Sequence, residues 1–150
     1  MSIYNKDFVF LNIEASTAED VITYMAQKLH EKGIVKKEYL TRIIQREADF
    51  PTGLNCGAVN VAVPHSECEL VNSPCLGIGV LKNPVGFHQM DDTEKVIPVS
   101  VVFMFALTEP HAHVEMLQKV FEFIQKPDEL KALSEVKNVE EATKILDGNF

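Results

Sequence analysis

Apolar residues near the start of the chain recur first at strand spacing and then at helical spacing. The run FVFLNI (8–13) predicts a strand. After this run, Ser16 or Thr17 is placed to cap a helix that Gly33 ends. The apolar stripe expected on that helix consists of Val21, Ile22, Met25, Ala26 and Leu29.

A second helix is predicted over residues 36–47, and a loop follows it. The helix cannot continue through the segment ADFPTGLN, because Pro51 and Gly53 favour a loop. The side of the helix that is expected to face inward carries Leu40, Ile43 and Ile44.

Apolar runs in the middle of the chain predict the strands of a sheet. These runs lie at residues 58–63, 75–82 and 95–107. The last two are separated by a turn-rich segment, 83–94, which has room for a short edge strand. The run VIPVSVVFMFAL (96–107) is too short for a bilayer span, which needs about 20 residues, and its Val and Phe content suits a strand buried on both faces.

Helical spacing returns in the last third of the chain. Helices are predicted over residues 113–125, 127–134 and 139–146. The apolar face expected on the first of them consists of Val114, Leu117, Phe121 and Ile124. Helices before and after a run of strands, with little strict alternation, predict a single α/β domain over residues 1–150: a sandwich with a mixed central sheet and helices on both faces.

Composition and charge disfavour several classes of function. The chain has a net charge of −8 and no dense run of basic residues, so general affinity for nucleic acid or for an anionic membrane is not expected. The N-terminal residues lack the pattern of a signal peptide, and the three cysteines form no CxxC pair. We therefore expect a cytoplasmic protein in a reducing compartment.

His65 has the most suggestive position of the histidines. Val63 is biased toward extended backbone, and Pro64 has no N–H to donate, so the strand is expected to end there and to present His65 at its terminus. An unperturbed histidine side chain has a pKa of about 6.5 and two distinct ring nitrogens, one of which can act as a nucleophile or base. The alternative is an inert surface histidine in a turn.

A zinc site is a second possible use of the same region. It would combine Cys56, His65, Cys68 and His88, but their spacing matches no familiar ligand pattern. We therefore expect the three cysteines to be free thiols without a chemical role, and we expect no metal and no organic cofactor.

Two neighbouring motifs carry a resemblance to a known family. READFPTG (46–53) followed by VAVPHSE (61–67) resembles the signature of the mannitol/fructose-type enzyme IIA domains of the bacterial phosphoenolpyruvate-dependent sugar phosphotransferase system. The resemblance extends over residues 21–146, through NPVGFHQMDD, VIPVSVVFMFAL and HVEMLQKVFEFIQKPDELKAL. Within the family, the motif READFPTGL (46–54) and the occurrence of the domain as a separate chain are most similar to the galactitol branch.

The resemblance implies a phosphocarrier that uses His65. The phosphocarrier protein HPr would donate a phosphoryl group to this histidine, and a cysteine of a separate enzyme IIB would accept it, with the membrane enzyme IIC downstream. The resemblance also implies Nε2 as the phosphorylated atom, with Nδ1–H held by a backbone carbonyl; the residues themselves do not choose between the two nitrogens.

Five further residues match positions of the family motifs or adjoin them. Arg46 matches the family's arginine, and its planar guanidinium suits two phosphoryl oxygens. His113 matches a histidine that heads a helix beside the phosphorylated one; it is either an auxiliary group or a polar residue at a helix border. The remaining three either bind substrate or partner, or merely shape their loops: Glu47, Thr52 and Ser66.

The main alternative function is regulatory. A protein resembling the nitrogen-type enzyme IIA would use the same His65 chemistry, but its phosphorylation state would control a partner and feed no sugar. A binding module for a metal or small ligand is a third reading, and it requires His65 to be inert.

Overall fold

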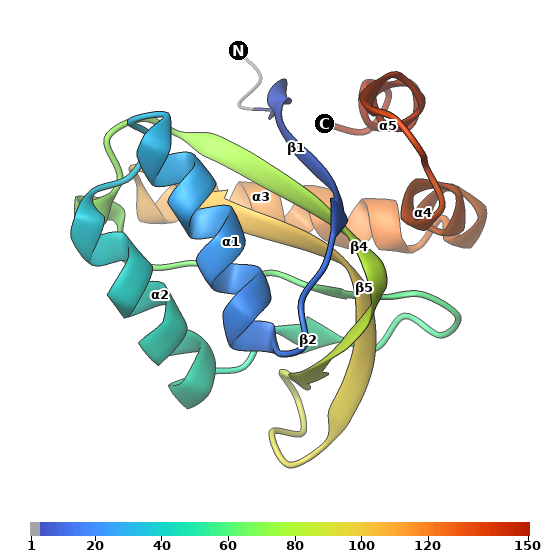
Figure 1. Ribbon diagram of the computed structural model, residues 1–150, viewed down its shortest axis with the longest axis horizontal. Coiled ribbons are helices and arrows are strands. Elements are labelled where there is room, and N and C mark those ends of the chain that lie inside the picture. Colours follow the sequence, from blue (N-terminus) through green and yellow to red (C-terminus); the bar gives the residue numbers. More distant parts are fainter. Residues whose placement is uncertain (1–3) are drawn as a thin grey trace.

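The computed structural model describes residues 4–150, which form one mixed sheet with helices on both faces (Figure 1). The strands are β1 (Tyr4–Ile13), β2 (Gly53–Leu54), β3 (Asn60–Ala62), β4 (Cys75–His88) and β5 (Val96–Ala106). The helices are α1 (Ala18–Glu31), α2 (Lys37–Asp49), α3 (Pro110–Ile124), α4 (Pro127–Ser134) and α5 (Val139–Leu146), with a short 3-10 turn at Cys68–Leu70. No helix in this part of the chain is long and apolar enough to cross a membrane.

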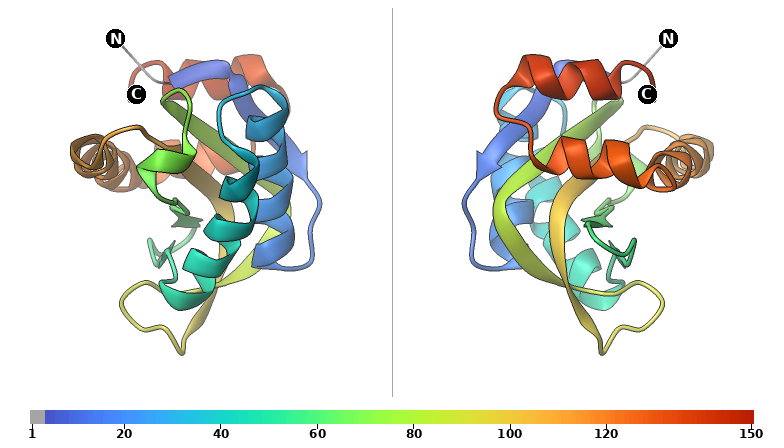
Figure 2. Two further views of the ribbon diagram at one scale, coloured as in Figure 1. Left: turned by 90° about the vertical axis from the view of Figure 1, so that its left-hand side faces the viewer. Right: turned by 90° about the vertical axis from the view of Figure 1, so that its right-hand side faces the viewer.

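The sheet has the strand order β1-β4-β5-β3-β2. β4 and β5 form a long antiparallel pair at its centre, β1 runs parallel to β4, and β3 runs parallel to β5. The short β2 is antiparallel to β3. Figure 2 shows α1 and α2 on one side of this sheet and α3, α4 and α5 on the other. The predicted α/β sandwich with a mixed sheet is therefore confirmed.

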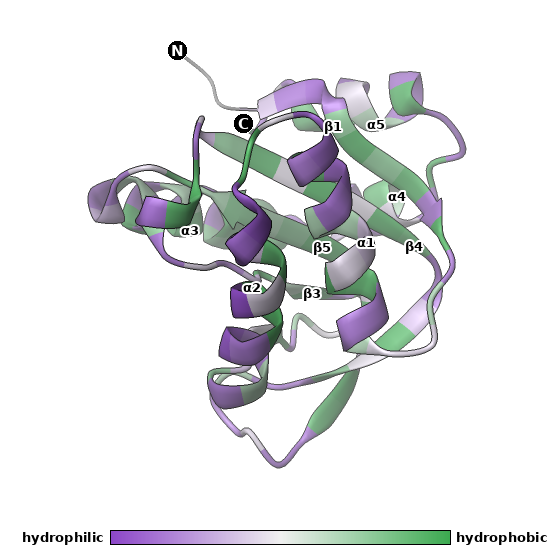
Figure 3. Cartoon of the chain, turned by 60° about the vertical axis from the view of Figure 1, so that its left-hand side comes forward, coloured by the Kyte–Doolittle hydropathy of each residue, from purple (hydrophilic) through white to green (hydrophobic). Residues whose placement is uncertain are grey.

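Each face of the sheet has its own apolar core. Alternate residues of β5 point to opposite faces, so Val102 and Met104 join the core under α1 and α2, whereas Phe103 and Phe105 join the core under the other helices. β5 is thus buried on both faces, as its composition predicts. Figure 3 shows hydrophilic residues on the outer sides of α1 and α2 and hydrophobic residues along β4 and β5.

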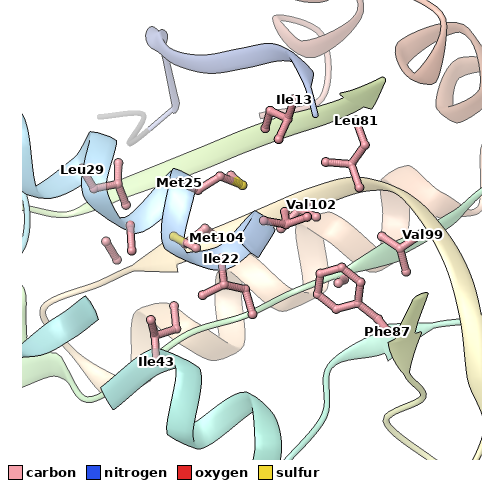
Figure 4. Close-up of a cluster of buried hydrophobic side chains, with 14 of the residues drawn as sticks. Ile13, Ile22, Met25, Leu29, Ile43, Leu81, Phe87, Val99, Val102 and Met104 are labelled. Atoms are coloured by element: carbon pink, nitrogen blue, oxygen red, sulfur yellow. The ribbon is translucent and has the colours of Figure 1, made fainter. Parts of the chain in front are cut away.

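The prediction for the first helix is confirmed in detail. Thr17 is the N-cap, because its side-chain oxygen accepts a hydrogen bond from the backbone N–H of Asp20 at 3.1 Å. All residues of the predicted stripe are buried, and Figure 4 shows Ile22, Met25 and Leu29 pointing into the core with side chains from the sheet.

The predicted apolar face of the third helix is partly wrong: Leu117 and Ile124 are partly buried against the core, but Val114 and Phe121 are exposed. α3 begins at Pro110 and not at His113, and the residues that it buries are Met116, Val120 and Phe123. Val114, on the predicted face, is 57% exposed. Apolar residues occur on more than one side of α3, so two stripes fit helical spacing. The packing of Phe123 against Phe103 of β5, with ring centroids 6.0 Å apart, selects the other one.

The segment after residue 82 also differs from its prediction. Residues 83–88 continue β4 and pair with β5, so they form no separate edge strand. The pairing register of β4 with β5 shifts between Val80 and Val85. The segment 82–84, Lys-Asn-Pro, lies within this irregularity, so it resembles a turn in the sequence but is part of the strand. The turn itself is confined to the residues between His88 and Val96.

Gly53 stands where the loop after α2 passes close to the end of β4. Its carbonyl accepts a hydrogen bond from the N–H of Met90 at 2.8 Å, and a Cβ at this position would lie 2.6 Å from the carbonyl oxygen of His88. We expect Gly53→Ala to lower the free energy of unfolding by about 1–3 kcal/mol, because backbone must move to relieve the contact. Urea denaturation measures this change. Gly148→Ala is the matched control, since a Cβ there meets nothing within 4 Å, and equal stability of the two variants would contradict the expectation.

Candidate active site

His65 lies just beyond the end of β3, in an extension of the strand's path. Pro64 cannot donate to the sheet, but its carbonyl accepts a hydrogen bond from the N–H of Phe105 at 3.0 Å, and His65 pairs with Phe105 in an isolated parallel bridge. The proline therefore ends regular pairing without releasing the chain. The His65 ring is half-buried at this edge.

The tautomer of His65 follows from a single contact. Nδ1 of the ring lies 3.0 Å from the carbonyl oxygen of Val63. A carbonyl oxygen only accepts hydrogen bonds, so Nδ1 carries the proton. In the neutral ring Nε2 then holds the free lone pair, which makes Nε2 the nucleophilic nitrogen.

Four of the residues singled out from the sequence line one pocket of about 430 Å³: His65, Arg46, Ser66 and His113. They come from separate elements, since Arg46 lies on α2 and His113 on α3. The rest of the lining is supplied by Glu67, Cys68, Glu69, Thr108 and Pro110. Chain segments that are distant in sequence thus converge on His65.

His113 lies beside His65 in the first turns of α3. The two ring centroids are 5.4 Å apart with an interplanar angle of 66°. Burial lowers the pKa of His113, and the nearby His65 and Arg46 lower it further, so His113 is neutral near pH 7. Its buried Nε2 has no hydrogen-bond partner among the described residues.

Arg46 is held loosely at the pocket. One of its terminal nitrogens, Nη1, lies 3.4 Å from Oε1 of Glu67, and its guanidinium lies over the Phe50 ring at 5.8 Å. Its Nε is buried and has no partner in the described part of the chain. Arg46 therefore lines the pocket with a guanidinium whose hydrogen-bonding capacity is only partly used, which suits it to an anion.

Glu67 accepts hydrogen bonds on both of its carboxylate oxygens. Arg42 donates to Oε1 through Nε at 2.7 Å, and the Ser66 hydroxyl donates to Oε2 at 2.7 Å. Partial burial raises the pKa of Glu67, but the hydrogen bonds from Ser66 and Arg42 outweigh it and lower the pKa to about 2. The carboxylate is thus ionised at any physiological pH.

Glu47 and Thr52 bind each other and do not line the pocket. The Thr52 hydroxyl donates to Oε1 of Glu47 at 2.7 Å, and the Thr52 N–H donates to Oε2 at 2.9 Å. Thr52 in turn accepts from the N–H of Val63, through its hydroxyl at 3.2 Å and its carbonyl at 3.3 Å. The carbonyl of Val63 binds Nδ1 of His65. Glu47 and Thr52 therefore help to position the histidine through the backbone of Val63, although they do not contact the ring.

The family model described as "Phosphoenolpyruvate-dependent sugar phosphotransferase system, EIIA 2" matches residues 2–149. The chain belongs to this family. It is therefore an EIIA-type phosphotransferase component, as the resemblance of its motifs implies.

Relatives of this EIIA chain include sugar-specific proteins. It is 31% identical over 128 residues to the "PTS system galactitol-specific EIIA component" of Escherichia coli (strain K12), an alignment that covers 84% of this chain and 83% of that protein.

Solved structures of other EIIA proteins have the same fold. The complex of enzyme IIAMTL and phosphorylated enzyme IIBMTL from Escherichia coli aligns with a TM-score of 0.80 at 21% identity, over 97% of this chain and 99% of that one. The nitrogen regulatory protein IIA-Ntr from Neisseria meningitidis aligns with a TM-score of 0.69 at 22% identity, over 96% of each chain.

The Glu47 carboxyl of this EIIA chain predicts a pH-dependent stability. Burial raises the pKa of Glu47 from 4.5 to about 7, although the hydrogen bonds from Thr52 oppose the shift. The folded chain therefore binds this proton more tightly than the unfolded chain. The stability that Glu47 contributes is fully present below pH 4.5 and is lost as the pH rises through about 7, a change of about 1–3 kcal/mol.

Urea denaturation at about pH 5 and about pH 8 measures this loss. Glu47→Gln should remove most of it, whereas Asp49→Asn, an exposed carboxylate two residues later on α2, should retain it. Parallel pH profiles for wild type and Glu47→Gln would contradict the assignment.

Sequence reasoning missed two charged residues at the site, Arg42 and Glu67. Arg42 precedes Arg46 by four residues, so the two arginines lie on the same side of α2, and this spacing is a signal that was present in the sequence. Glu67 follows His65 by two residues, but nothing in the sequence indicates that α2 packs beside that turn. The buried Tyr39, whose hydroxyl donates to the carbonyl of Phe105 at 2.8 Å, was likewise not expected.

The cysteines take no part in a metal site in the described structure. Cys56, Cys68 and Cys75 are free thiols, and within residues 4–150 no group of three His, Cys, Asp or Glu side chains is arranged to hold a metal ion. Burial raises the pKa of Cys75 to about 12, so this thiol stays protonated.

Proposed function

We propose that this chain carries phosphoryl groups for sugar uptake. Nε2 of His65 accepts the group from phosphorylated HPr and passes it to a cysteine of the cognate enzyme IIB. The observation that carries the proposal is the arrangement around this nitrogen. The hydrogen bond from Nδ1 to the carbonyl of Val63 leaves Nε2 free, and the pocket is lined by Arg46 and His113, each of which has a buried nitrogen without a partner among the described residues.

The chemistry requires little beyond position and charge. The phosphorus–nitrogen bond to the donor histidine of HPr breaks as a bond from phosphorus to Nε2 forms, and negative charge is spread over three equatorial oxygens. Arg46 supplies a positive charge with several donors, and Ser66 supplies a hydroxyl. A neutral His113 can donate one ring N–H to the same group, and it adds no second positive charge beside the nucleophilic ring of His65.

The surface near the pocket suits partners that bind and leave. Phe50 is 67% exposed where it lies beneath Arg46, and Val114, next to His113, is also exposed. Exposed apolar side chains beside a polar centre favour modest, short-lived contacts of the kind that a carrier makes with donor and acceptor in turn. We expect HPr to be the phosphoryl donor. We also propose that the transfer takes place in the cytoplasm.

The sugar is proposed to be galactitol or a similar sugar alcohol. The support is the galactitol-specific relative, which matches this chain over most of both lengths. A regulatory role like that of IIA-Ntr would use the same His65, and the likeness to that protein is one of fold. Enzyme IIB as acceptor is supported by the fold shared with enzyme IIAMTL, which was solved in complex with phosphorylated enzyme IIBMTL.

Incubation with phosphoenolpyruvate, enzyme I and HPr tests the proposal. We expect acid-labile phosphate on this chain, and its absence would overturn the phosphocarrier function. A galactitol-type IIB is then added to the labelled protein. Loss of label to IIB supports sugar transport, whereas label that stays on the chain with every candidate IIB favours the regulatory alternative.

A further inference from the structure

We propose that Glu67 is an internal competitor of the phosphoryl group: its carboxylate binds Arg46 and Ser66 in the unphosphorylated chain and gives them up when His65 is phosphorylated. Glu67 would thereby set how readily the phosphoryl group leaves. This inference rests on the proposed function, because it concerns the donors that would hold the phosphoryl group on His65.

The contacts of Glu67 place it in that role. Glu67 lines the same pocket as His65. Its carboxylate has three partners: the neighbouring Ser66 and the two arginines of α2, Arg42 and Arg46. Ser66 and Arg46 are the donors on which the phosphoryl group also depends. A hydroxyl has one proton to donate, so Ser66 serves either the carboxylate or the phosphoryl group.

The two arginines hold Glu67 unequally. Arg42 makes the short contact, 2.7 Å from Nε to Oε1, whereas Arg46 approaches the same oxygen only to 3.4 Å. Arg46 also keeps its buried Nε without a partner in the described chain. Arg42 therefore anchors the carboxylate, and Arg46 is the arginine that can turn to a new anion at small cost.

The exchange changes hydrogen-bond acceptors and moves no proton to Glu67. The phosphoryl group passes from the donor nitrogen to Nε2 of His65, and Arg46 and Ser66 shift from the carboxylate to phosphoryl oxygens. Glu67 remains ionised and close by, so it repels the new dianion. The phosphorylated state is therefore less stable than it would be with the same donors and a neutral residue at position 67.

Glu67→Gln tests the inference, because it removes the charge and keeps an oxygen that can accept from Arg42. Glu38→Gln is the control; it removes a carboxylate from the first turn of α2, the helix that carries Arg42 and Arg46, and Glu38 forms no ion pair with any described residue. Phosphoramidate, a small phosphoryl donor, loads His65 in each protein without any protein partner.

Two readouts follow from the loaded proteins. The first is the midpoint of the ³¹P chemical-shift titration of phospho-His65, which Glu67→Gln should move to lower pH by about half a unit or more, because the second ionisation of the phosphoryl group is no longer opposed. The second is the equilibrium distribution of phosphate after HPr is added. Glu67→Gln should shift it toward this chain by about threefold or more, and Glu38→Gln should leave both readouts at the wild-type value.

The outcomes separate this inference from the proposed function. An unchanged titration midpoint in Glu67→Gln, or a shift to higher pH, overturns the role of Glu67. If wild-type phospho-His65 gives nothing to HPr, the proposed function fails, and the titration midpoint alone decides the role of Glu67. If phosphoramidate and phosphorylated HPr both leave His65 unmodified, both are overturned.

Discussion

A His65→Ala variant should take up no phosphate from phosphorylated HPr, so that its label falls to the background of the assay. His65 is the nucleophile, and no neighbouring group is placed to replace it. His113 is the nearest ring, with its centroid 5.4 Å from that of His65, but it is held in α3 and its Nε2 is buried. The measurement is radiolabel from phosphoenolpyruvate after a fixed time with enzyme I and HPr, together with the intact mass of the chain.

His111→Ala is the matched control for this loss. His111 lies two residues before His113, but its side chain is 80% exposed, and its Nε2 lies 3.0 Å from Oε1 of Glu115 on the same helix. We expect this variant to label like the wild type. Labelling of His65→Ala at the wild-type level would place the phosphate elsewhere and end the assignment.

An Arg46→Gln variant should accept the phosphoryl group about 100-fold more slowly than the wild type, with the affinity for HPr little changed. The reason is that the guanidinium neutralises charge that develops on the transferring group, and loss of one such preorganised donor typically costs 10²–10³-fold in rate. Glutamine keeps an N–H donor, but its side chain is shorter and carries no charge. Quenched-flow measurement of transfer from phosphorylated HPr gives the rate constant.

Arg42→Gln is the control. It removes a positive charge near the pocket without removing a side chain that is proposed to contact the phosphoryl group. Arg42 lies one helical turn before Arg46 and binds the same Glu67, but it does not line the pocket around His65. We expect its transfer rate to fall by less than about tenfold. A rate in Arg42→Gln as low as that in Arg46→Gln would show that Arg46 has no special role.

Much of this fold is predictable because local pattern and packing agree. The apolar stripe of α1 has a single side that can be buried, and β5 is so rich in Val and Phe that burial on both faces is its natural state. α3 is different, because Val114 and Phe121 offer a second apolar side that the sheet does not use. Only the approach of α3 to Phe103 distinguishes the two sides, and that approach is a property of the whole fold.

The candidate site was predictable as far as its motifs extend. Pro64 indicated a strand end, and the structure places His65 there. The sequence left the role of Glu47 open between binding and shaping the loop: Arg46 and Glu47 are adjacent, yet Arg46 lines the pocket and Glu47 binds Thr52. Helical geometry separates such neighbours by about 100° around the axis, so adjacency in sequence says little about shared contacts.

The central claim is that Nε2 of His65 carries the phosphate, and long-range ¹H–¹⁵N NMR spectra of the phosphorylated, ¹⁵N-labelled chain test it most directly. These spectra distinguish the two ring nitrogens of each histidine. We predict phosphorus on Nε2 of His65, with Nδ1 still protonated and bonded to the carbonyl of Val63. Phosphorus on Nδ1 of His65, or on His113, would contradict the account.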